Sequence, residues 1–265
     1  MRRSTLFWGS ILIVIGLLVL LDNMNIININ IWSLIWPLFL ILLGVWILFG
    51  HLLGGKTYEV EHAQIPLDGS TDARIRVNHA AGRLHINGGT APGYLVEGDF
   101  SGGVDVDTRR RGDQLEVSMK LPSMTFPDIP WFWGGGNLDW SFNISSETPI
   151  SLNISMGAGE SRIDLSSLKV SDVKLQTGAS STALILPEQA GFTNLHVEAG
   201  VTSVLINIPS GVAARIRNQS GLTSLNVDKA RFLRQGNVYQ SGDYDTAQNK
   251  VDMDIRAGVG SIEIR

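Results

Sequence analysis

The C-terminal half of the chain repeats one short phrase. "AGVTSVLINI" begins at Ala199, "SGLTSLNV" at Ser220 and "AGVGSIEI" at Ala257. An alignment on small residues gives intervals of 21, 20, 21 and 37 residues between Ala158, Ala179, Ala199, Ser220 and Ala257. A period of about 20 residues is the length of one coil of stacked β-structure, so the repeat predicts rungs that bury a shared core.

Apolar residues keep their places within each repeat. Five residues after each small residue lies an apolar one: Ile163, Leu184, Val204, Leu225 and Ile262. Apolar residues two apart with polar ones between them indicate half-buried strands. Each repeat is therefore expected to be a strand, a small-residue corner where backbones approach closely, a second strand and a turn. The turns are marked by Pro187, Gly191, Pro209 and Gly211.

The end of the chain and the region before the repeats extend this pattern. The final phrase is expected to be the terminal rung, where Glu263 and Arg265 would block end-to-end growth. The longer last interval holds "KARFLRQGNVYQSGDYDTAQ", expected to be a hairpin or loop. Alternating strands are predicted at 73–86, 94–100 and 113–120. Residues 56–265 are thus predicted to form one all-β domain of stacked repeats, with the clear repeats at about 150–265.

The first 55 residues differ sharply from the rest. Residues 6–21 and 31–53 contain no Asp, Glu, Lys or Arg and are rich in Leu, Ile and Val. A helix of about 20 such residues spans a hydrocarbon core of about 30 Å. We expect a transmembrane hairpin with helices at about 5–22 and 31–53. A cleaved signal peptide is the alternative for the first run; it fits the basic "MRR" start, but no small-residue cleavage site follows.

The charges that flank the two runs predict the topology. Arg2 and Arg3 precede the first run and Lys56 follows the second, whereas the linker "DNMNIININ" has no Lys or Arg. The positive-inside rule therefore places both termini of this multi-pass membrane protein in the cytoplasm. Gly9 and Gly16 lie seven residues apart and are candidate helix-packing positions, although glycine is also simply common in membrane helices.

Composition excludes several classes of chemistry. The chain has no cysteine, which excludes disulfides, thiolate catalysis and cysteine-ligated metals. A formal net charge of −4 does not suggest a nucleic-acid partner. The five histidines stand at no metal-ligand spacing, and no serine lies in a G-x-S-x-G elbow. We therefore predict no catalytic residue, no metal and no cofactor.

Two pairs of carboxylates are the remaining candidates for acid–base chemistry. Asp243 and Asp245, and Asp252 and Asp254, are each two residues apart, so each pair would share a strand face. Solvated strand faces and turns are the alternative interpretation. The cluster "RRRGDQ" at 109–114 is similarly either a polar hairpin turn or a docking patch.

An unusual aromatic segment interrupts the β-pattern at 126–140, "FPDIPWFWGGGNLDW". Its prolines and three consecutive glycines disfavour regular structure. Trp131, Phe132, Trp133 and Trp140 are candidate contacts with a partner protein or with the membrane interface. The alternative is that they fold back over one end of the β-core.

Two parts of the sequence resemble a known family. "WGSILIVIGLLVLLDNMNI" followed by "WPLFLILLGVWILF" resembles the LiaI/LiaF-type transmembrane hairpin. The repeats and the ending "YDTAQNKVDMDIRAGVGSIEI" resemble the toast-rack β-domain of LiaF-like cell-wall-active antibiotics response proteins. The resemblance implies a bacterial membrane protein of the envelope stress response, whose best-known relatives restrain a sensor histidine kinase of a two-component system. The single helical hairpin departs from relatives with four spans, and the resemblance supplies no catalytic residues.

Three functions follow from these observations. The first is a non-enzymatic membrane-anchored regulator that acts by protein contact, possible partners being a sensor kinase or another membrane protein. The second is a self-assembling β-scaffold, a homo-oligomer joined through the open ends of the stack. The third is an enzyme that acts on a glycan along the β-surface, which would need a row of acids across adjacent rungs. The outward positions Asp164, Ile185, Leu205, Asn226 and Glu263 do not form such a row.

Overall fold

The computed structural model describes residues 36, 37, 39–41, 59–122 and 138–265. Residues 36, 37 and 39–41 are helical, and the rings of Trp36 and Phe39 stack with centroids 5.9 Å apart. Within these described stretches, no helix is both long and apolar enough to cross a bilayer. The predicted spans at 5–22 and 31–53 lie almost wholly outside the described residues, so the helical hairpin stays a prediction.

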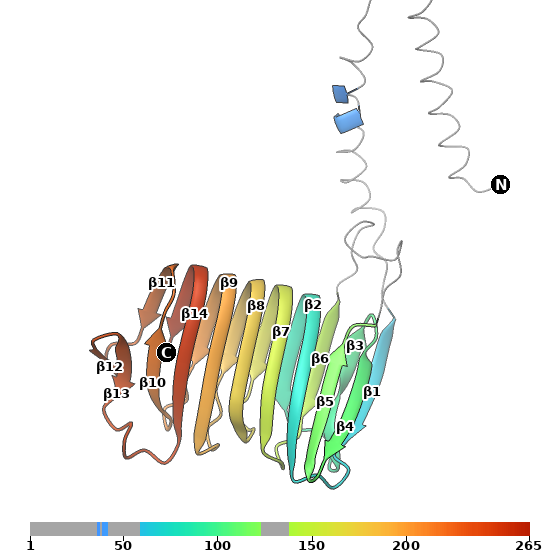
Figure 1. Ribbon diagram of the computed structural model, residues 1–265, viewed down its shortest axis with the longest axis horizontal. Helices are drawn as coiled ribbons and strands as arrows, with labels where there is room; N and C mark the ends of the chain where they lie inside the picture. Colours follow the sequence, from blue (N-terminus) through green and yellow to red (C-terminus); the bar gives the residue numbers. More distant parts are fainter. Residues whose placement is uncertain (1–35, 38, 42–58, 123–137) are drawn as a thin grey trace, which may run out of the picture. The chain divides into compact units, whose positions relative to one another are not determined.

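Fourteen strands belong to one compact unit made of Thr57–Phe126 and Gly136–Arg265. The strands are seen in Figure 1. Their bounds are β1 (Val60–Pro66), β2 (Asp72–Gly88), β3 (Tyr94–Ser101), β4 (Asp105–Arg111), β5 (Gln114–Lys120), β6 (Asp139–Ile144), β7 (Ile150–Asp164), β8 (Val170–Ile185), β9 (Phe192–Asn207), β10 (Ala213–Asn218), β11 (Leu222–Val227), β12 (Phe232–Gln235), β13 (Val238–Ser241) and β14 (Lys250–Ile264). The strands predicted at 73–86, 94–100 and 113–120 are confirmed as β2, β3 and β5.

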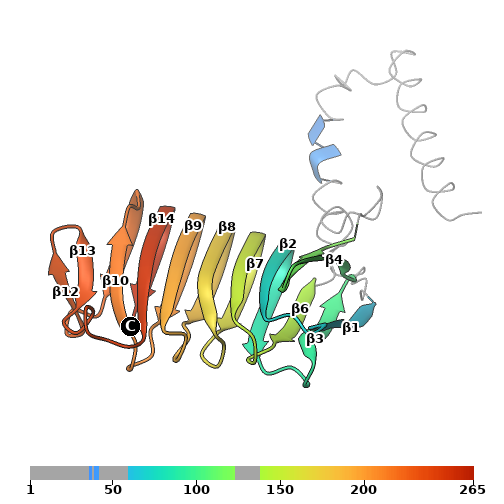
Figure 2. The same cartoon turned by 60° about the horizontal axis from the view of Figure 1, so that its bottom comes forward.

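Each long strand is one rung that bends over a corner. In β7, Leu152, Ile154 and Met156 are buried before the corner, and Ser161 and Ile163 are buried after it. The buried positions change from even to odd numbers because the chain turns between them. The two arms of a rung therefore lie in two facing layers that enclose the core, as Figures 1 and 2 show for β2, β7, β8, β9 and β14.

Pairing runs through both layers. The first arms form the order β4-β5-β2-β7-β8-β9-β14-β10-β13-β12, and the second arms form β1-β3-β6-β2-β7-β8-β9-β14-β11. The five long strands pair in parallel along both arms. Two rungs are each made of two strands: β5 and β6 supply the two arms of one, and β10 and β11 those of the other. Residues 121–138 connect β5 to β6.

The expected register is confirmed in part. Ala158 faces Ala179 and Ala199 faces Ala257, as predicted. Between β8 and β9 the prediction was wrong by two residues, because Ala179 faces Val201 rather than Ala199. A shift of two residues keeps every side chain on its face, which is why the predicted core positions are still buried.

Five rungs have a glycine at the corner: Gly157, Gly178, Gly200, Gly258 and Gly221. In β2 the same position is Ala80, whose carbonyl oxygen lies against Gly157. A Cβ at Gly200 would lie 2.7 Å from the carbonyl oxygen of Gly178, and one at Gly258 would lie 2.8 Å from that of Gly200. These distances are too short for a real Cβ, so glycine at the corner allows one rung to approach the next.

The order of the rungs also differs from the prediction. The C-terminal strand β14 lies between β9 and the rung made of β10 and β11, so it is an interior rung. Glu263 and Arg265 therefore do not terminate the stack. An interior position satisfies both backbone edges of β14, which an end position would not. The expected hairpin is confirmed: β12 and β13 pair antiparallel, and β13 pairs with β10 at the end of the first layer.

Candidate functional site

The aligned corners border a shallow groove of about 940 Å³. Backbone of the corner glycines Gly157, Gly178, Gly200 and Gly258 lines it, together with the residues one or two positions before each glycine. The groove thus crosses five neighbouring rungs on the first-arm side.

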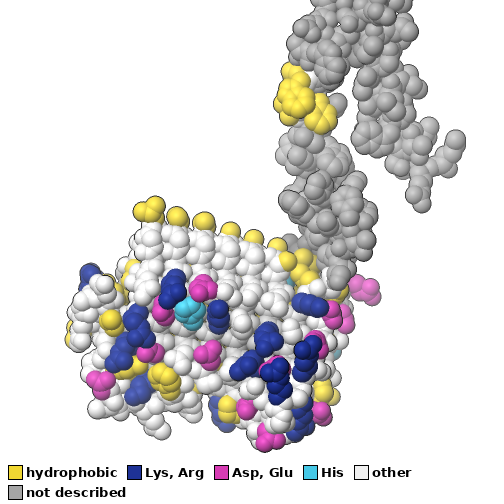
Figure 3. Space-filling model, viewed as in Figure 1, with side chains coloured by type: hydrophobic (Ala, Val, Ile, Leu, Met, Phe, Trp, Pro, Cys, Tyr) yellow, Lys and Arg dark blue, Asp and Glu magenta, His cyan; other side chains and the backbone are white. Residues whose placement is uncertain are grey.

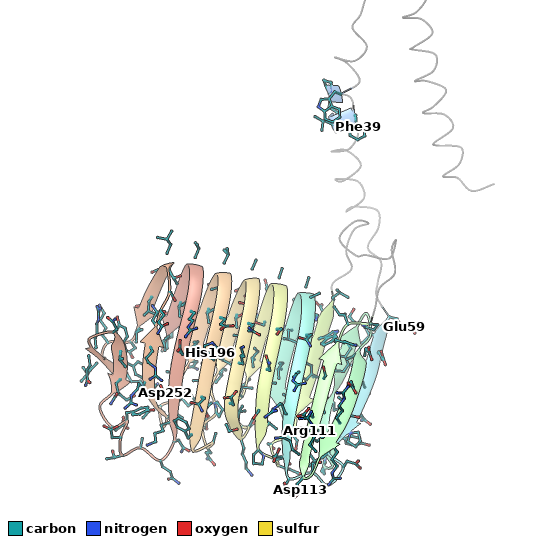
Figure 4. The ribbon with its side chains drawn as sticks, viewed as in Figure 1. Phe39, Glu59, Arg111, Asp113, His196 and Asp252 are labelled. Carbon is teal, nitrogen blue, oxygen red and sulfur yellow. The ribbon has the colours of Figure 1, made fainter. Side chains whose placement is uncertain are left out.

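Glu198 on β9 is the acidic residue among the charged residues that line this groove, the others being Lys120 and Arg256. His196 Nε2 lies 2.9 Å from its Oε1, and Gln176 Nε2 donates to its Oε2 at 2.6 Å. The hydrogen bond from His196, followed by that from Gln176, holds the pKa of Glu198 below its usual value. Both carboxylate oxygens already have partners, so Glu198 is a fixed anion rather than a free general base. Figure 4 labels His196 in the middle of the first-arm face.

A row of exposed apolar side chains lies just past the glycines. We call it the corner ridge; its members face one another across adjacent rungs in the order Ala81, Ala158, Ala179, Val201, Val259 and Leu222. The three larger ones are well exposed, Val201 at 60%, Val259 at 49% and Leu222 at 83%. Figure 3 shows the ridge as evenly spaced hydrophobic side chains along one edge.

Trp140 is a core residue, so its assignment as a partner or membrane contact was wrong. Its side chain is fully buried, with the ring of Phe100 edge-on at 5.2 Å and the ring of His79 at 4.9 Å. The alternation of β6 turns Trp140 and Phe142 inward, where burial of large aromatic rings is most favourable.

Trp131, Phe132 and Trp133 lie outside the described residues, as do Gly9 and Gly16. Their assigned contacts therefore stay predictions. The described residues on either side of 123–137, Pro122 and Leu138, can nevertheless be placed. Lys120 faces Asn78 and Asp139 faces Arg83, so both ends lie at the level of the corner of β2.

The arginine cluster at 109–111 forms the end of β4, just before the β4–β5 turn; Figure 4 labels Arg111 and Asp113 there. Arg110 donates to the carbonyl oxygen of Asp68 at 2.8 Å. Arg111 lies 3.7 Å from Glu116, a buried carboxylate that Arg74 and Arg76 also approach within 3.8 Å. These partners favour a polar hairpin over a free docking patch.

Three of the four paired carboxylates lie in ion pairs. Arg217 donates to Asp252 at 2.6 Å, Arg256 lies 3.5 Å from Asp254, and Arg215 lies 3.6 Å from Asp245. Asp252 is labelled in Figure 4. In the observed register Asp164 faces Ile185, and Glu263 faces Leu205 and Asn226, so neither carboxylate has an acidic neighbour in its row. Among the described residues no three His, Asp or Glu side chains could together hold a metal ion.

Comparison with protein families assigns the chain. Residues 54–207 match the model of the N-terminal domain of toast_rack, DUF2154, and residues 6–48 match the LiaI-LiaF-like transmembrane region. The chain is therefore a membrane-associated protein with a β-rich toast-rack domain built of repeats. It belongs to the family of the toast_rack N-terminal domain, and the resemblance inferred from the sequence is confirmed.

Two solved structures are similar to this chain. A candidate cell adhesion protein from Clostridium sporogenes ATCC 15579 is 20% identical, with a TM-score of 0.68 over 78% of this chain and 98% of that one. At this identity the likeness shows the fold alone. A candidate adhesin from Bacteroides fragilis NCTC 9343 is 9% identical, with a TM-score of 0.27 over 78% of this chain and 97% of that one. No curated protein matches the chain.

The corner ridge was the feature that the sequence interpretation missed. The residue after the glycine is Val201, Leu222 or Val259 in the three quoted phrases. An alignment on the glycine would have placed these residues in one exposed row. The alignment on Ala and Ser did not reveal this row. The aligned Ala or Ser follows the corner glycine in β7 and β8 but precedes it in the later rungs.

The buried histidine of the corner predicts a pH-dependent stability. Burial holds the pKa of His79 below its usual value, although its hydrogen bond to Leu138 and the charge of Asp139 act in the opposite direction. His79 Nε2 donates to the Leu138 carbonyl oxygen at 3.1 Å, and Nδ1 is buried without a partner. A second proton would therefore be placed in an apolar site.

Below about pH 6.5 the unfolded chain takes up this proton while the folded chain does not. The free energy of unfolding therefore decreases as the pH is lowered, with a limiting slope of about 1.4 kcal/mol per pH unit. Unfolding of the full chain in detergent, followed by circular dichroism between about pH 7.5 and about pH 5.5, measures the slope. We expect His79→Gln to reduce the slope and the control His85→Gln, in the same strand, to leave it nearly unchanged. An unchanged slope in His79→Gln would contradict the assignment.

Proposed function

We propose that the protein is a non-enzymatic, membrane-anchored regulator of the bacterial envelope stress response that acts by contact with another membrane protein. The observation that carries the proposal is the combination of a LiaI-LiaF-like transmembrane region with a toast-rack domain in one chain. A sensor histidine kinase is the proposed partner, as the family resemblance implies.

The surface of the β-domain supports action by contact. Several of its described carboxylates are held by arginine, histidine or glutamine, as at Glu116, Glu198 and Asp252. The groove and the corner ridge instead offer a continuous surface across five or more rungs, built on a paired backbone that keeps its shape. A change of envelope state would act by altering the affinity of this surface for its partner.

Self-assembly is the second candidate function. Strand β11 pairs with β14, and β11 ends the second layer of the described sheet. Its outer backbone edge could therefore accept a strand of another copy, which is the usual hazard of an edge strand. Sedimentation of the full chain in detergent separates the two candidates: growth of the particle with concentration favours the scaffold.

The proposed topology places both termini, and with them the β-domain, in the cytoplasm, because of Arg2, Arg3 and Lys56. The cysteine-free chain makes this directly measurable. Single Asn25→Cys and Asn237→Cys variants are labelled in intact cells with a membrane-impermeant thiol reagent. We expect label at position 25 only, with position 237 labelled after the cells are opened. Labelling of position 237 in intact cells would reverse the topology and place the domain outside the cytoplasm.

The regulatory role predicts a change in signalling when the protein is removed. Deletion of the gene in its own host is expected to raise an envelope-stress reporter several-fold in the absence of antibiotic, because a restraint on the kinase is lost. Complementation with the full chain should restore the low level, whereas residues 1–55 alone should not. A reporter level that is unaffected by deletion, both with and without a cell-wall antibiotic, would contradict the proposal.

A further inference from the structure

The chain enters the β-domain at the corner edge. Glu61 on β1 faces Phe100, Phe100 faces Trp140, and Trp140 faces Leu84. β1 runs in the same direction as the second arm of β2, so Glu59, two residues before Glu61, is level with Gly82 just past the corner. Figure 4 places Glu59 at the same edge as the corners.

The segment before this entry point is short. The match to the transmembrane region ends at residue 48, which leaves residues 49–58 to reach Glu59. Ten residues span at most about 35 Å when fully extended. Eight strand spacings of about 4.8 Å separate β1 from β11, so the corner edge is about 40 Å long. With the proposed membrane attachment, one end of this edge would stay within about 35 Å of the end of the transmembrane region.

The other end of the edge carries the exposed hydrophobic side chains. Val201, Val259 and Leu222 occupy the three rungs farthest from the chain entry, and the ridge positions nearer to it are alanines. The outward residues three positions past the corner glycines of these rungs are Ser203, Ser261 and Ser224, which carry no charge. The distal part of the edge is thus apolar along the corner ridge and uncharged on the second-arm side of the ridge.

We propose that the distal corner ridge, Val201, Val259 and Leu222, rests in the interfacial region of the lipid bilayer. The edge of the domain then lies along the membrane surface, held at one end by the chain and at the other by these three side chains. Apolar side chains that project from a convex edge, beside uncharged residues, are suited to insertion at the depth of the lipid headgroups. The chain raises the effective concentration of the ridge at the bilayer, so a weak lipid contact suffices. The proposal rests on the membrane attachment in the proposed function but on no signalling partner.

A second copy of the chain is a less suitable occupant of the ridge. The ridge is one residue wide on a convex edge, whereas a stable interface between two proteins buries about 800 Å² on each partner. The adjoining groove contains the fixed charge of Glu198 and the exposed cation Arg256, which two identical edges would have to desolvate.

The test uses the full chain in vesicles of equal parts phosphatidylethanolamine and phosphatidylglycerol. A Leu222→Cys variant carries an environment-sensitive fluorophore, and nitroxide groups on the lipid acyl chains act as quenchers. Leu233→Cys is the matched control, because Leu233 is also an exposed leucine, at 58%, but lies on β12 at the end of the first layer. Leu233 faces Gln240, which in turn faces Arg215. Arg215 faces Asp252, which stands six residues before the corner glycine Gly258. Six residues of a strand span about 20 Å, so position 233 is far from the corner edge.

We expect the probe at position 222 to emit at shorter wavelength and to be quenched several-fold more strongly than the probe at position 233. Val201→Ser together with Val259→Ser should weaken the quenching at 222. Equal quenching at the two positions, in a chain that still floats with the vesicles, would overturn the lipid contact and leave the attachment intact. A wavelength shift at 222 that grows with protein density and is insensitive to nitroxide lipid would assign the ridge to a second copy, which also overturns it. A chain that does not float with the vesicles would refute both the contact and the attachment.

Discussion

The close approach of neighbouring rungs at the glycine corner is the constraint on which the rest of the β-domain depends. At Gly157, Gly178, Gly200, Gly258 and Gly221 the space for a Cβ is taken by, or lies against, backbone of the next rung. The bend occurs at the same place in each rung, so parallel pairing continues through both arms and buries one core between them. The cost of glycine in extended structure is offset by this continuous pairing and burial.

The same constraint produces the surface features on which function is proposed. Corners that lie in register form a straight edge, and the residue after each glycine necessarily projects from it. Alanine, valine or leucine at that position makes the corner ridge, and the residues before the glycines line the groove. The chain also enters the domain at this edge, because Glu59 is level with Gly82.

Much of this architecture could be predicted from local sequence pattern, and the remainder depends on long-range pairing. The two-residue alternation identified the strands and the buried columns, and the repeat length identified the rungs. The order of the rungs could not be predicted, because nothing in the sequence of β14 distinguishes an interior from a terminal position. Trp140 was misassigned because its neighbours at 131–133 are aromatic too, and only the pairing of β6 with β2 reveals that it turns inward. The corner ridge was hidden by an alignment that shifted by two residues, a slip that leaves strand faces unchanged.

The interior position of β14 is the structural claim that most directly fixes the corner edge and its ridge, and cross-linking tests it. Ser203 Oγ lies 3.3 Å from Ser261 Oγ, on adjacent strands β9 and β14, whereas Ser224 on β11 lies beyond β14. Adjacent strands are about 4.8 Å apart, and a disulfide requires Cα atoms within about 7 Å. The measurement is oxidation of the otherwise cysteine-free full chain carrying either Ser203→Cys with Ser261→Cys or Ser203→Cys with Ser224→Cys. The account predicts an intramolecular disulfide in the first pair and none in the second; a disulfide between positions 203 and 224 would show that the rungs stack in sequence order and would contradict it.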